Sequence, residues 1–364
     1  MPKTTLLLFL LLLSVPPFAP EAGAQTFEPA QYTHQHVAGV WQSGYLNGPS
    51  TGSMLGFGAM TMDAGGNIYL AGGNRVRVLT SSGRVWNLAG TGVRGYKDGP
   101  AQNAMFNTGG GGYDFQGIAK NSSGALFIPD GINARIRMIY KTTAGQWWVA
   151  TYAGNGSTYL SPGQTGSINN VKFLGHYGVA VDSSDNVWTL DYFGIYKITP
   201  AGSVTCYANA AGTAATMQAD GLGNIYILTR EPNNCLYKVS SAGTVARIAG
   251  MLASEVSSLV SQGLPIPVDG PALQSTFWGV SHFVVAPDGS ALYASNGDEY
   301  CIRRIKAGYT MTLYPDGWHT DTTSRNKGWF LGGPMYIDPK GVIYLMGNNP
   351  PDQLGLRKIV PVQR

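Results

Sequence analysis

Charged side chains are scarce in this sequence. Asp, Glu, Lys and Arg make up 12% of the 364 residues, about half of their share in an average soluble protein. The formal net charge is only +4, and no run of five like charges occurs. Because binding to a phosphate backbone needs a dense cluster of Lys and Arg, the composition argues against a nucleic-acid-binding protein.

Cysteine is nearly absent as well. The three cysteines, Cys206, Cys235 and Cys301, include no closely spaced pair of the kind that a zinc knuckle uses. Their spacing leaves two interpretations open. Either two of them form a disulfide and leave one free thiol, or all three are buried and unpaired.

Long apolar segments are missing apart from one near the N-terminus. It runs from Leu6 to Val15 and is followed by Ala22-Gly23-Ala24. This order predicts a secretory signal peptide over residues 1–24 and a mature chain that begins at Gln25. An uncleaved membrane anchor is the alternative, but it needs an apolar run about twice as long.

Helical periodicity is also missing, except for residues 251–263, which predict one short helix. The sequence is instead rich in glycine, with 50 residues, and in tyrosine, with 20. Short segments of alternating apolar and polar residues are separated by Gly-containing turns, which is typical of an all-β protein.

One pattern occurs six times along the chain. Each copy has an apolar strand that usually ends in Asp or Asn, a Gly-containing turn, and a second strand centred on an aromatic residue. A polar loop, a third strand and often a fourth strand ending in Ala-Gly follow. The central aromatic residues are Tyr69, Phe127, Trp188, Tyr226, Tyr293 and Tyr344. Four antiparallel strands repeated six times predict a six-bladed β-propeller.

The predicted domain spans residues 25–364. Its blades fall at about 40–90, 91–154, 155–209, 210–250, 251–314 and 315–364. The last blade lacks a fourth strand, whereas residues 31–39 form a strand that belongs to no other blade. We therefore expect residues 31–39 to pair with 356–362 and to close the ring, so that no strand edge is left open. Closure by side-chain packing alone is the alternative.

The connections between blades carry Asp-Gly-Pro. Residues 98–100 are the first copy, and Asp269 and Asp316 belong to similar motifs. We expect Asp98-Gly99-Pro100 to form a turn just before the next innermost strand, with the carboxylate accepting backbone N–H groups. This turn role is favoured over acid–base catalysis.

Residues 88–139, "AGTGVRGYKDGPAQNAMFN…GIA…GALFIPDGINARIRMI", resemble an NHL repeat, and the similarity extends over nearly the whole mature chain. The resemblance implies a propeller fold. Asp130 and Asp191 match the Asp that often follows the second strand of the repeat, whereas its characteristic His is absent. Some intracellular members bind RNA, but the signal peptide and the sparse positive charge argue against that function here.

The innermost strands place two histidines at one repeat position. Aligned on their terminal Asp or Asn, the strands carry His176 and His282 six residues earlier in blades three and five, and Phe57 stands there in blade one. The amidating lyases of the NHL family draw three zinc-binding histidines from alternate blades, which this layout resembles in part. Asp114 lies one position away in blade two. A catalytic zinc site needs three protein ligands, so the set is incomplete.

Ligand contacts at the axial mouth are therefore predicted for His176, His282, Asp114 and Phe57, and a zinc or calcium ion held by His176 and His282 is the alternative. No cofactor is otherwise expected. Asn121 and Asn155 begin Asn-x-Ser sequences that are acceptors for N-glycosylation in a cell that carries it out.

Other recurrent side chains favour structural roles. Tyr69, Trp188 and Tyr293 are expected to pack between blades, and Arg137, Arg304 and Lys358 are interpreted as structural or rim charges. The tryptophans that do not recur could stack on a carbohydrate or protein partner. They are Trp147, Trp148, Trp278, Trp318 and Trp329.

Long connections of variable length are predicted to gather on one face of the ring, where they would form a binding surface. The sequence thus predicts a secreted, rigid binding or assembly module for an extracellular protein or glycan. Two alternatives are kept: a metal-dependent enzyme at the axial mouth, and a subunit of a self-assembling extracellular polymer.

Overall fold

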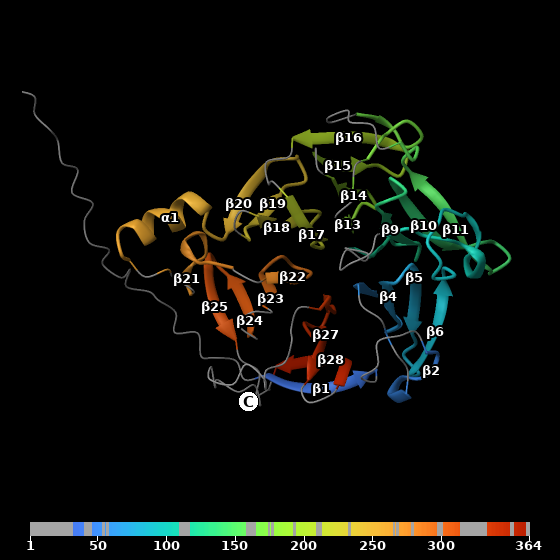
Figure 1. Ribbon diagram of the computed structural model, residues 1–364, viewed down its shortest axis with the longest axis horizontal. Coiled ribbons are helices and arrows are strands. Elements are labelled where there is room, and N and C mark those ends of the chain that lie inside the picture. The colour runs from blue at the N-terminus through green and yellow to red at the C-terminus, as the bar shows by residue number, and fades with distance from the viewer. Residues whose placement is uncertain are drawn as a thin grey trace, which may run out of the picture. The chain divides into compact units, whose positions relative to one another are not determined.

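The computed structural model describes most of the chain from residue 32 onward. The described ranges are 32–39, 46–52, 55, 58–108, 117–157, 165–173, 175, 178–191, 194–208, 213–231, 234–264, 266, 269–277, 280–296, 301–313, 333–349 and 353–361. All of them belong to one compact unit, Gln31–Arg364. Six antiparallel sheets stand around a common axis as the blades of a β-propeller (Figure 1), which confirms the predicted fold.

Blades 1 to 3 each have five strands in the described residues. Listed from the outer edge inward, blade 1 contains β2 (Gly48–Pro49), β6 (Arg84–Ala89), β5 (Arg75–Leu79), β4 (Ile68–Gly72) and β3 (Ala59–Met62). Blade 2 contains β7 (Gly99–Pro100), β11 (Trp147–Ala153), β10 (Arg135–Lys141), β9 (Leu126–Asp130) and β8 (Ala119–Lys120). Blade 3 contains β12 (Gly166–Ser167), β16 (Ser203–Ala208), β15 (Gly194–Ile198), β14 (Val187–Leu190) and β13 (Gly178–Val181).

The other three blades follow the same plan. Blade 4 contains β20 (Val245–Ala249), β19 (Leu236–Val239), β18 (Ile225–Glu231) and β17 (Thr213–Ala219). Blade 5 contains β21 (Gly270–Pro271), β25 (Tyr309–Leu313), β24 (Cys301–Lys306), β23 (Ala291–Asn296) and β22 (Val280–Val285). Blade 6 contains β1 (Tyr32–Ala38), β28 (Gln353–Pro361), β27 (Ile343–Asn349) and β26 (Met335–Ile337).

Few helices accompany these strands. The predicted short helix is present as α1 (Ala253–Ser261), between blades 4 and 5. In the described residues, a turn of 3-10 helix follows three of the four two-residue outer strands, β2, β7 and β21: η1 (Ser50–Gly52), η2 (Ala101–Asn103) and η3 (Ala272–Gln274). Within the described ranges, no helix has the length and apolar character that a membrane crossing requires.

The ring is closed by the N-terminal strand, as predicted. Strand β1 pairs antiparallel with β28, from Tyr32 opposite Pro361 to Ala38 opposite Leu356. The six innermost strands, β3, β8, β13, β17, β22 and β26, each contact the next around the axis, and β26 contacts β3 again. The strand that completes blade 6 comes from the other end of the chain. Closure of the ring therefore joins two segments that are far apart in the sequence.

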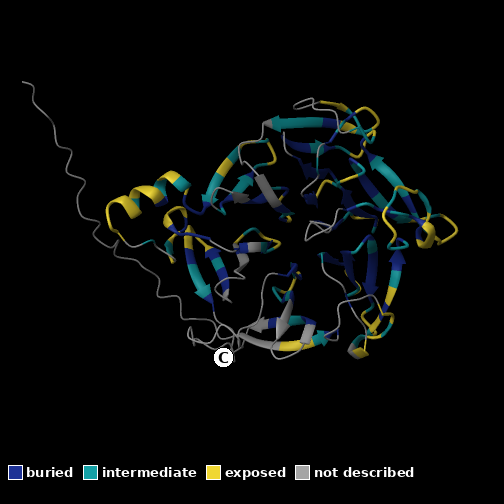
Figure 2. Ribbon diagram, in the orientation of Figure 1, coloured by how far each residue is buried: buried dark blue, intermediate teal, exposed yellow. Residues whose placement is uncertain are grey.

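The hydrophobic core is divided among the junctions between blades. The described residues form six clusters of buried side chains, and each combines residues of two neighbouring blades, including the junction of blade 6 with blade 1. Figure 2 shows the buried residues concentrated on the strands and exposed ones on α1 and the turns. A single blade has two apolar faces, so only stacking in a ring keeps both faces away from water.

The Asp-Gly-Pro motif lies at the outer edge of its blade, and the prediction of a turn before the innermost strand is wrong. Gly99 and Pro100 form β7, which pairs with Trp148 and Val149 on the outermost long strand of blade 2. Gly48-Pro49 and Gly270-Pro271 pair in the same way in blades 1 and 5. The three glycines have φ between 125° and 145°, which favours glycine there.

The Ala-Gly ending of the fourth strands reflects a close backbone approach. Gly90 has φ +90°, and a Cβ on it would lie 2.4 Å from the carbonyl oxygen of Asn74. Gly154 repeats this arrangement against the carbonyl oxygen of Ala134, at 2.5 Å. The outer strand therefore ends against the loop between the second and third strands, where no side chain fits.

Candidate functional site

The predicted axial residues fall mostly outside the described residues. Phe57, Asp114 and His176 belong to segments that the structure does not describe. His282 is half buried on β22, opposite Ser295 of β23, where the pairing register is irregular. Within the described ranges, no group of three or more His, Cys, Asp or Glu side chains is arranged to hold a metal ion. The metal assignment of His176 and His282 thus stays a prediction.

Aspartates at the ends of innermost strands are used by their own turns. In blade 3, Asp182 accepts hydrogen bonds from the backbone N–H groups of Ser184 and Asn186, from the Asn186 side chain, and from the Trp188 indole at 2.8 Å. Asp220 in blade 4 does the same with Asn224 and Tyr226. Trp188 and Tyr226 thus anchor their polar atoms on these carboxylates besides packing between blades.

The corresponding turn in blade 1 shifts two pKa values. Burial works to raise the pKa of Asp63, but hydrogen bonds from Asn67 and Tyr69 outweigh it and hold that pKa below its ordinary value. Burial and the neighbouring carboxylate raise the pKa of Tyr69 to about 12. Both shifts keep the carboxylate ionised and the phenol protonated near neutrality, which is the arrangement of a structural hydrogen bond.

The turns of Asp182 and Asp220 also border an axial cavity of about 260 Å³. It lies where the innermost strands of blades 3 to 6 end, and Asp182, Ser183, Gln218, Asp220 and Tyr336 are among its lining residues. Because the two carboxylates are already bonded to backbone and side-chain donors, neither is placed as a general acid or base.

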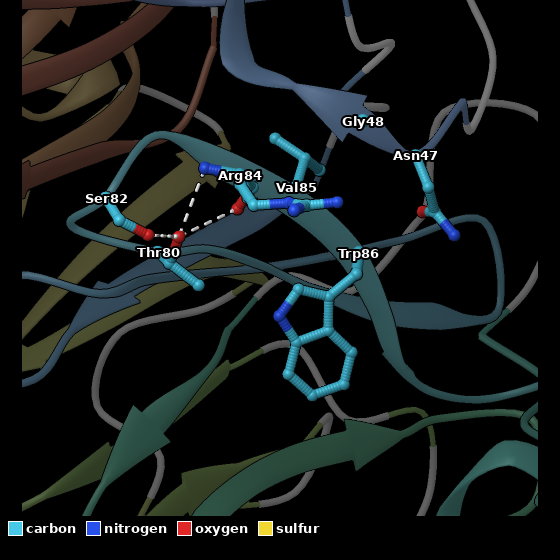
Figure 3. A pocket seen from close by; sticks show the side chains of 7 residues that line it. All are labelled: Asn47, Gly48, Thr80, Ser82, Arg84, Val85 and Trp86. Atoms are coloured by element: carbon cyan, nitrogen blue, oxygen red, sulfur yellow. Dashed lines mark hydrogen bonds between the residues drawn. The ribbon is translucent and has the colours of Figure 1, made fainter.

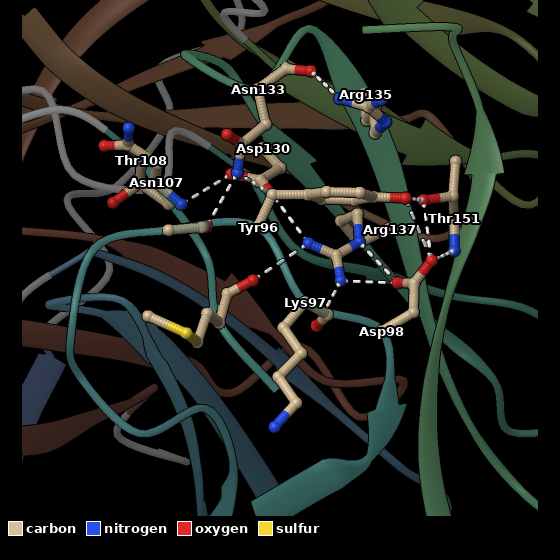
Figure 4. Close-up of polar contacts among 12 residues, drawn as sticks. Tyr96, Lys97, Asp98, Asn107, Thr108, Asp130, Asn133, Arg135, Arg137 and Thr151 are labelled. Atoms are coloured by element: carbon tan, nitrogen blue, oxygen red, sulfur yellow. Dashed lines mark hydrogen bonds and ion pairs between the residues drawn. The ribbon is translucent and has the colours of Figure 1, made fainter. Parts of the chain in front are cut away.

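The outer rim of blade 2 holds a buried arginine, shown in Figure 4. The Arg137 side chain is fully buried and pairs with Asp98 at 2.5 Å and with Asp130 at 2.7 Å. It also donates to the backbone carbonyl groups of Lys97 and Met105. The remaining oxygen of Asp98 accepts from the N–H and hydroxyl of Thr151. We call this arrangement of Asp98, Arg137 and Thr151 the rim clamp.

The rim clamp recurs in other blades. In blade 1, Arg77 donates to the Asn47 side chain at 2.8 Å. In blade 5, Arg303 pairs with Asp269 at 3.1 Å, and Thr312 donates to the same oxygen. The structural reading of Arg137 is therefore confirmed. The buried arginine of blade 5 is Arg303, however, and not the neighbouring Arg304, which is only half buried.

The tyrosine that precedes the motif stacks on this clamp. Tyr96 is 46% exposed, and its ring centroid lies 4.9 Å from the Arg137 guanidinium of the clamp and 4.0 Å from the guanidinium of Arg135. The Tyr96 hydroxyl is bonded to Thr151 and Asp98. Asp98 thus serves as the centre of an ion-pair network, whereas sequence reasoning assigned it to a simple turn. The signal that was missed is the arginine at the third position of the third strand.

Two cavities lie beside the turns of blades 1 and 2. The first, of about 520 Å³, is lined by Asn47, Gly48, Thr80, Ser82, Arg84, Val85 and Trp86 (Figure 3). The second, of about 480 Å³, is lined by Tyr69, Asn121, Ser123, Gly124, Ala125, Met138, Tyr140, Lys141 and Trp147. The walls of both cavities include turns that join the first strand of a blade to the second or the third strand to the fourth. They therefore lie on the short-turn side of the ring.

The sequence placed the binding surface on the opposite face. Much of the chain that would form it, including residues 109–116, 158–164 and 314–332, lies outside the described residues. Trp278, Trp318 and Trp329 also lie outside the described residues. Trp147, by contrast, is described and lines the second cavity, so one of the non-recurrent tryptophans does border a surface hollow.

The remaining candidate residues from the sequence are cysteines and possible glycosylation sites. Cys206 and Cys235 are free thiols, and burial raises the pKa of both. No disulfide therefore joins Cys206 to Cys235. Asn121 lies in a turn at the wall of the second cavity, and Asn155 is exposed after β11.

Comparisons with known proteins show the fold. No protein-family model and no curated protein matches the sequence. Among solved structures, the chain is similar to an auxiliary nutrient binding protein from Bacteroides ovatus, with TM-score 0.62 and 14% identity over 92% of this chain and 78% of that chain. It is also similar to a virginiamycin B lyase from Staphylococcus aureus, with TM-score 0.51 and 12% identity over 91% of this chain and 100% of that chain.

A third similar structure is a putative gluconolactonase, with TM-score 0.51 and 12% identity over 92% of this chain and 93% of that chain. Identities this low define the class of protein and no more. The chain is a β-propeller of a fold used both by binding proteins and by enzymes.

Proposed function

We propose that the protein is a secreted, rigid binding module for an extracellular protein or glycan. One observation carries the proposal: the cavities of blades 1 and 2 are open to the surface and lined by aromatic, hydroxyl and amide groups. The carboxylates at the axial cavity are instead engaged in their own turns. Such a combination suits recognition on a fixed scaffold better than acid–base chemistry.

Two further points support this function. The rim clamps tie the chain that enters blades 1, 2 and 5 to the strands of those blades, so the surface is pre-organised. The likeness to an auxiliary nutrient binding protein is in keeping with a binding role for this fold. We also infer that the blades are of the NHL type and that residues 1–24 direct the chain out of the cytoplasm.

The test is a partner screen on the secreted product. The N-terminus of the exported protein is expected at Gln25, which protein sequencing determines. That protein is then applied to a glycan panel and to candidate surface proteins, with calorimetry of each hit. Saturable binding with a defined stoichiometry supports the module, whereas turnover of any bound ligand would contradict it. Light scattering on the same sample tests the alternative of a polymer subunit.

An enzyme at the axial mouth is the second candidate, because His282 is half buried on an innermost strand. In that case, His176 and His282 would hold a zinc or calcium ion, and the ion would supply an activated water molecule. Metal analysis of the purified protein decides between the two functions. Stoichiometric metal that is lost in His282→Ala favours the enzyme, and metal-free protein that still binds its partner favours the module.

A further inference from the structure

The two cavities of blades 1 and 2 share several chemical features. Each combines one tryptophan with one basic side chain, Trp86 with Arg84 in the first and Trp147 with Lys141 in the second. Hydroxyl and amide side chains complete both walls. Among the described lining residues, the formal charge of each wall comes from Arg84 or Lys141, and none of these residues is an Asp or a Glu. Two carboxylates border the second wall from outside: Asp63 accepts from the Tyr69 hydroxyl, and Asp185 accepts from the Ser122 hydroxyl.

The tryptophans present ring surface to solvent. Trp86 is 37% exposed, and Figure 3 shows its indole pointing away from the strand that carries it. Trp147 packs by part of its surface against the core between blades 1 and 2. The ammonium of the exposed Lys141 lies 5.2 Å from its ring centroid. Trp147 is itself half buried, so part of its surface is accessible to solvent and to a polar ligand.

The turn that borders the second cavity differs in its residues from the corresponding turns of blades 1, 3 and 4. Where blades 1, 3 and 4 have an Asp bonded to an Asn and to a Tyr or Trp, blade 2 has Asn121, Ala125 and Phe127. The Asn121 Oδ1 atom accepts hydrogen bonds from the Ala125 N–H at 2.9 Å and from the Ser123 hydroxyl at 2.8 Å. Because Oδ1 alone makes the turn, the Nδ2 donor of this cavity-lining side chain has no role in it.

These features are those of a saccharide site. A sugar ring has an apolar C–H face that stacks on an aromatic ring, and its hydroxyls pair with amide and hydroxyl groups. A basic side chain in the wall adds attraction for an acidic group on the ligand. A neutral sugar would leave Arg84 and Lys141 without a function, and a basic ligand would be repelled by them.

We propose that the cavities of blades 1 and 2 bind an acidic saccharide, with sugar rings on Trp86 and Trp147 and carboxylates beside Arg84 and Lys141. Asn121 donates from Nδ2 to a ring hydroxyl in the second cavity. The inference rests on the proposed function as a binding module, and it specifies the ligand class and the place where the ligand binds.

Calorimetry with oligogalacturonate tests the proposal, with a cello-oligosaccharide as the uncharged probe. The protein is produced in a host without N-glycosylation, so that Asn121 is unmodified. We expect binding of oligogalacturonate only, with affinity reduced about tenfold in Trp86→Ala and in Trp147→Ala. Lys141→Gln is expected to weaken binding and to reduce its dependence on salt.

Lys197→Gln is the matched control. The Lys197 ammonium also lies 5.2 Å from a tryptophan ring, but that ring belongs to Trp188, which is fully buried. The control variant should bind like the parent protein. If Trp147→Ala unfolds, Trp147→Phe and Lys141→Gln still test the site, because each keeps much of the packing.

Three results would overturn the inference. These are the absence of oligogalacturonate binding, equal binding of the uncharged probe, and binding that neither tryptophan variant alters. Saturable binding of another glycan or of a protein would then leave the proposed function intact, whereas a protein that turns over its ligand would remove that function too.

Discussion

At the scale of single residues, the rim clamp shows how a buried charge is kept in a protein with few charges. Arg137 is fully buried, and its guanidinium contacts two carboxylates and two backbone carbonyl groups. Such a group is costly to bury unless all its donors are engaged. The partner Asp98 comes from the connection that precedes the blade, so the clamp joins segments about 40 residues apart.

Asp98→Ala is expected to destabilise the protein by about 2 to 3 kcal/mol, because it leaves part of the Arg137 charge uncompensated. Urea unfolding followed by circular dichroism measures the loss. Asp98→Asn should cost less, since blade 1 already uses Asn47 as the acceptor for Arg77. Equal stability of Asp98→Ala and the parent protein would show that the clamp contributes nothing.

From the hydrogen bond between Asp63 and Tyr69, we expect the stability of the folded protein to fall at both low and high pH. The folded pKa of Asp63 is lowered, so its contribution is present above the unfolded pKa and is lost as the pH falls through the folded value. The pKa of Tyr69 is raised to about 12. Its contribution is present below the unfolded value of about 10 and is lost as the pH rises toward the folded value.

Stability should therefore decline in strong acid and again above about pH 10. Unfolding by urea at a series of pH values, with phenolate absorbance followed in parallel, measures both limbs. Tyr69→Phe should reduce the alkaline limb while leaving the fold intact. An alkaline limb of the same size in this variant would assign the effect to other tyrosines.

At the scale of elements, the helix α1 depends on one ion pair. Arg247 on β20 makes a two-fold contact with Glu255, at 2.6 and 2.7 Å. Glu255 also accepts the N–H of Leu252, which precedes the helix. The pKa of Glu255 is lowered, and the hydrogen bonds from Arg247 are the main cause. One side chain thus caps the helix and fastens it to blade 4.

Glu255→Gln should destabilise α1 by about 0.5 to 1 kcal/mol, as expected for a cap and a half-exposed ion pair. Hydrogen exchange of the α1 amides is the measurement, because global unfolding would dilute a local effect. In a double-mutant cycle with Arg247→Gln, the second change should add little. Full additivity of the two changes would mean that the side chains do not interact.

At the scale of the whole molecule, stability depends on closing the ring. Blade 6 contains strands from both ends of the chain, and β1 is its outermost strand. Without β1, the edge of β28 is exposed and Ala38 is lost from the core between blades 6 and 1.

A chain that begins at residue 39 is expected to lose several kcal/mol of the roughly 5 to 15 kcal/mol typical of a folded protein. It should also form oligomers through the open edge. A chain that begins at residue 31 keeps β1 and serves as the control. Thermal unfolding and light scattering compare the two, and identical behaviour would contradict the role of β1 in closure.

The sequence by itself determined the strands, the repeat and the closure by residues 31–39. These depend on alternation, turn residues and the count of strands, which are local or additive along the chain. The position of Asp-Gly-Pro at the outer edge could not be predicted in this way, and neither could the partnership of Asp98 with Arg137. Both depend on which distant strand the connection reaches.

The cavity of blade 2 was likewise decided by the tertiary structure alone, whereas the described lining of the blade 1 cavity comes from blade 1 itself. Trp147 could be marked from the sequence because it does not recur, but its neighbours in the cavity come from two different blades. Side chains from separate repeats meet only when blades stack, because the apolar faces of each blade must be shared with its neighbours. That stacking, driven by burial of those faces, brings Tyr69 of blade 1 and Trp147 of blade 2 to the same wall.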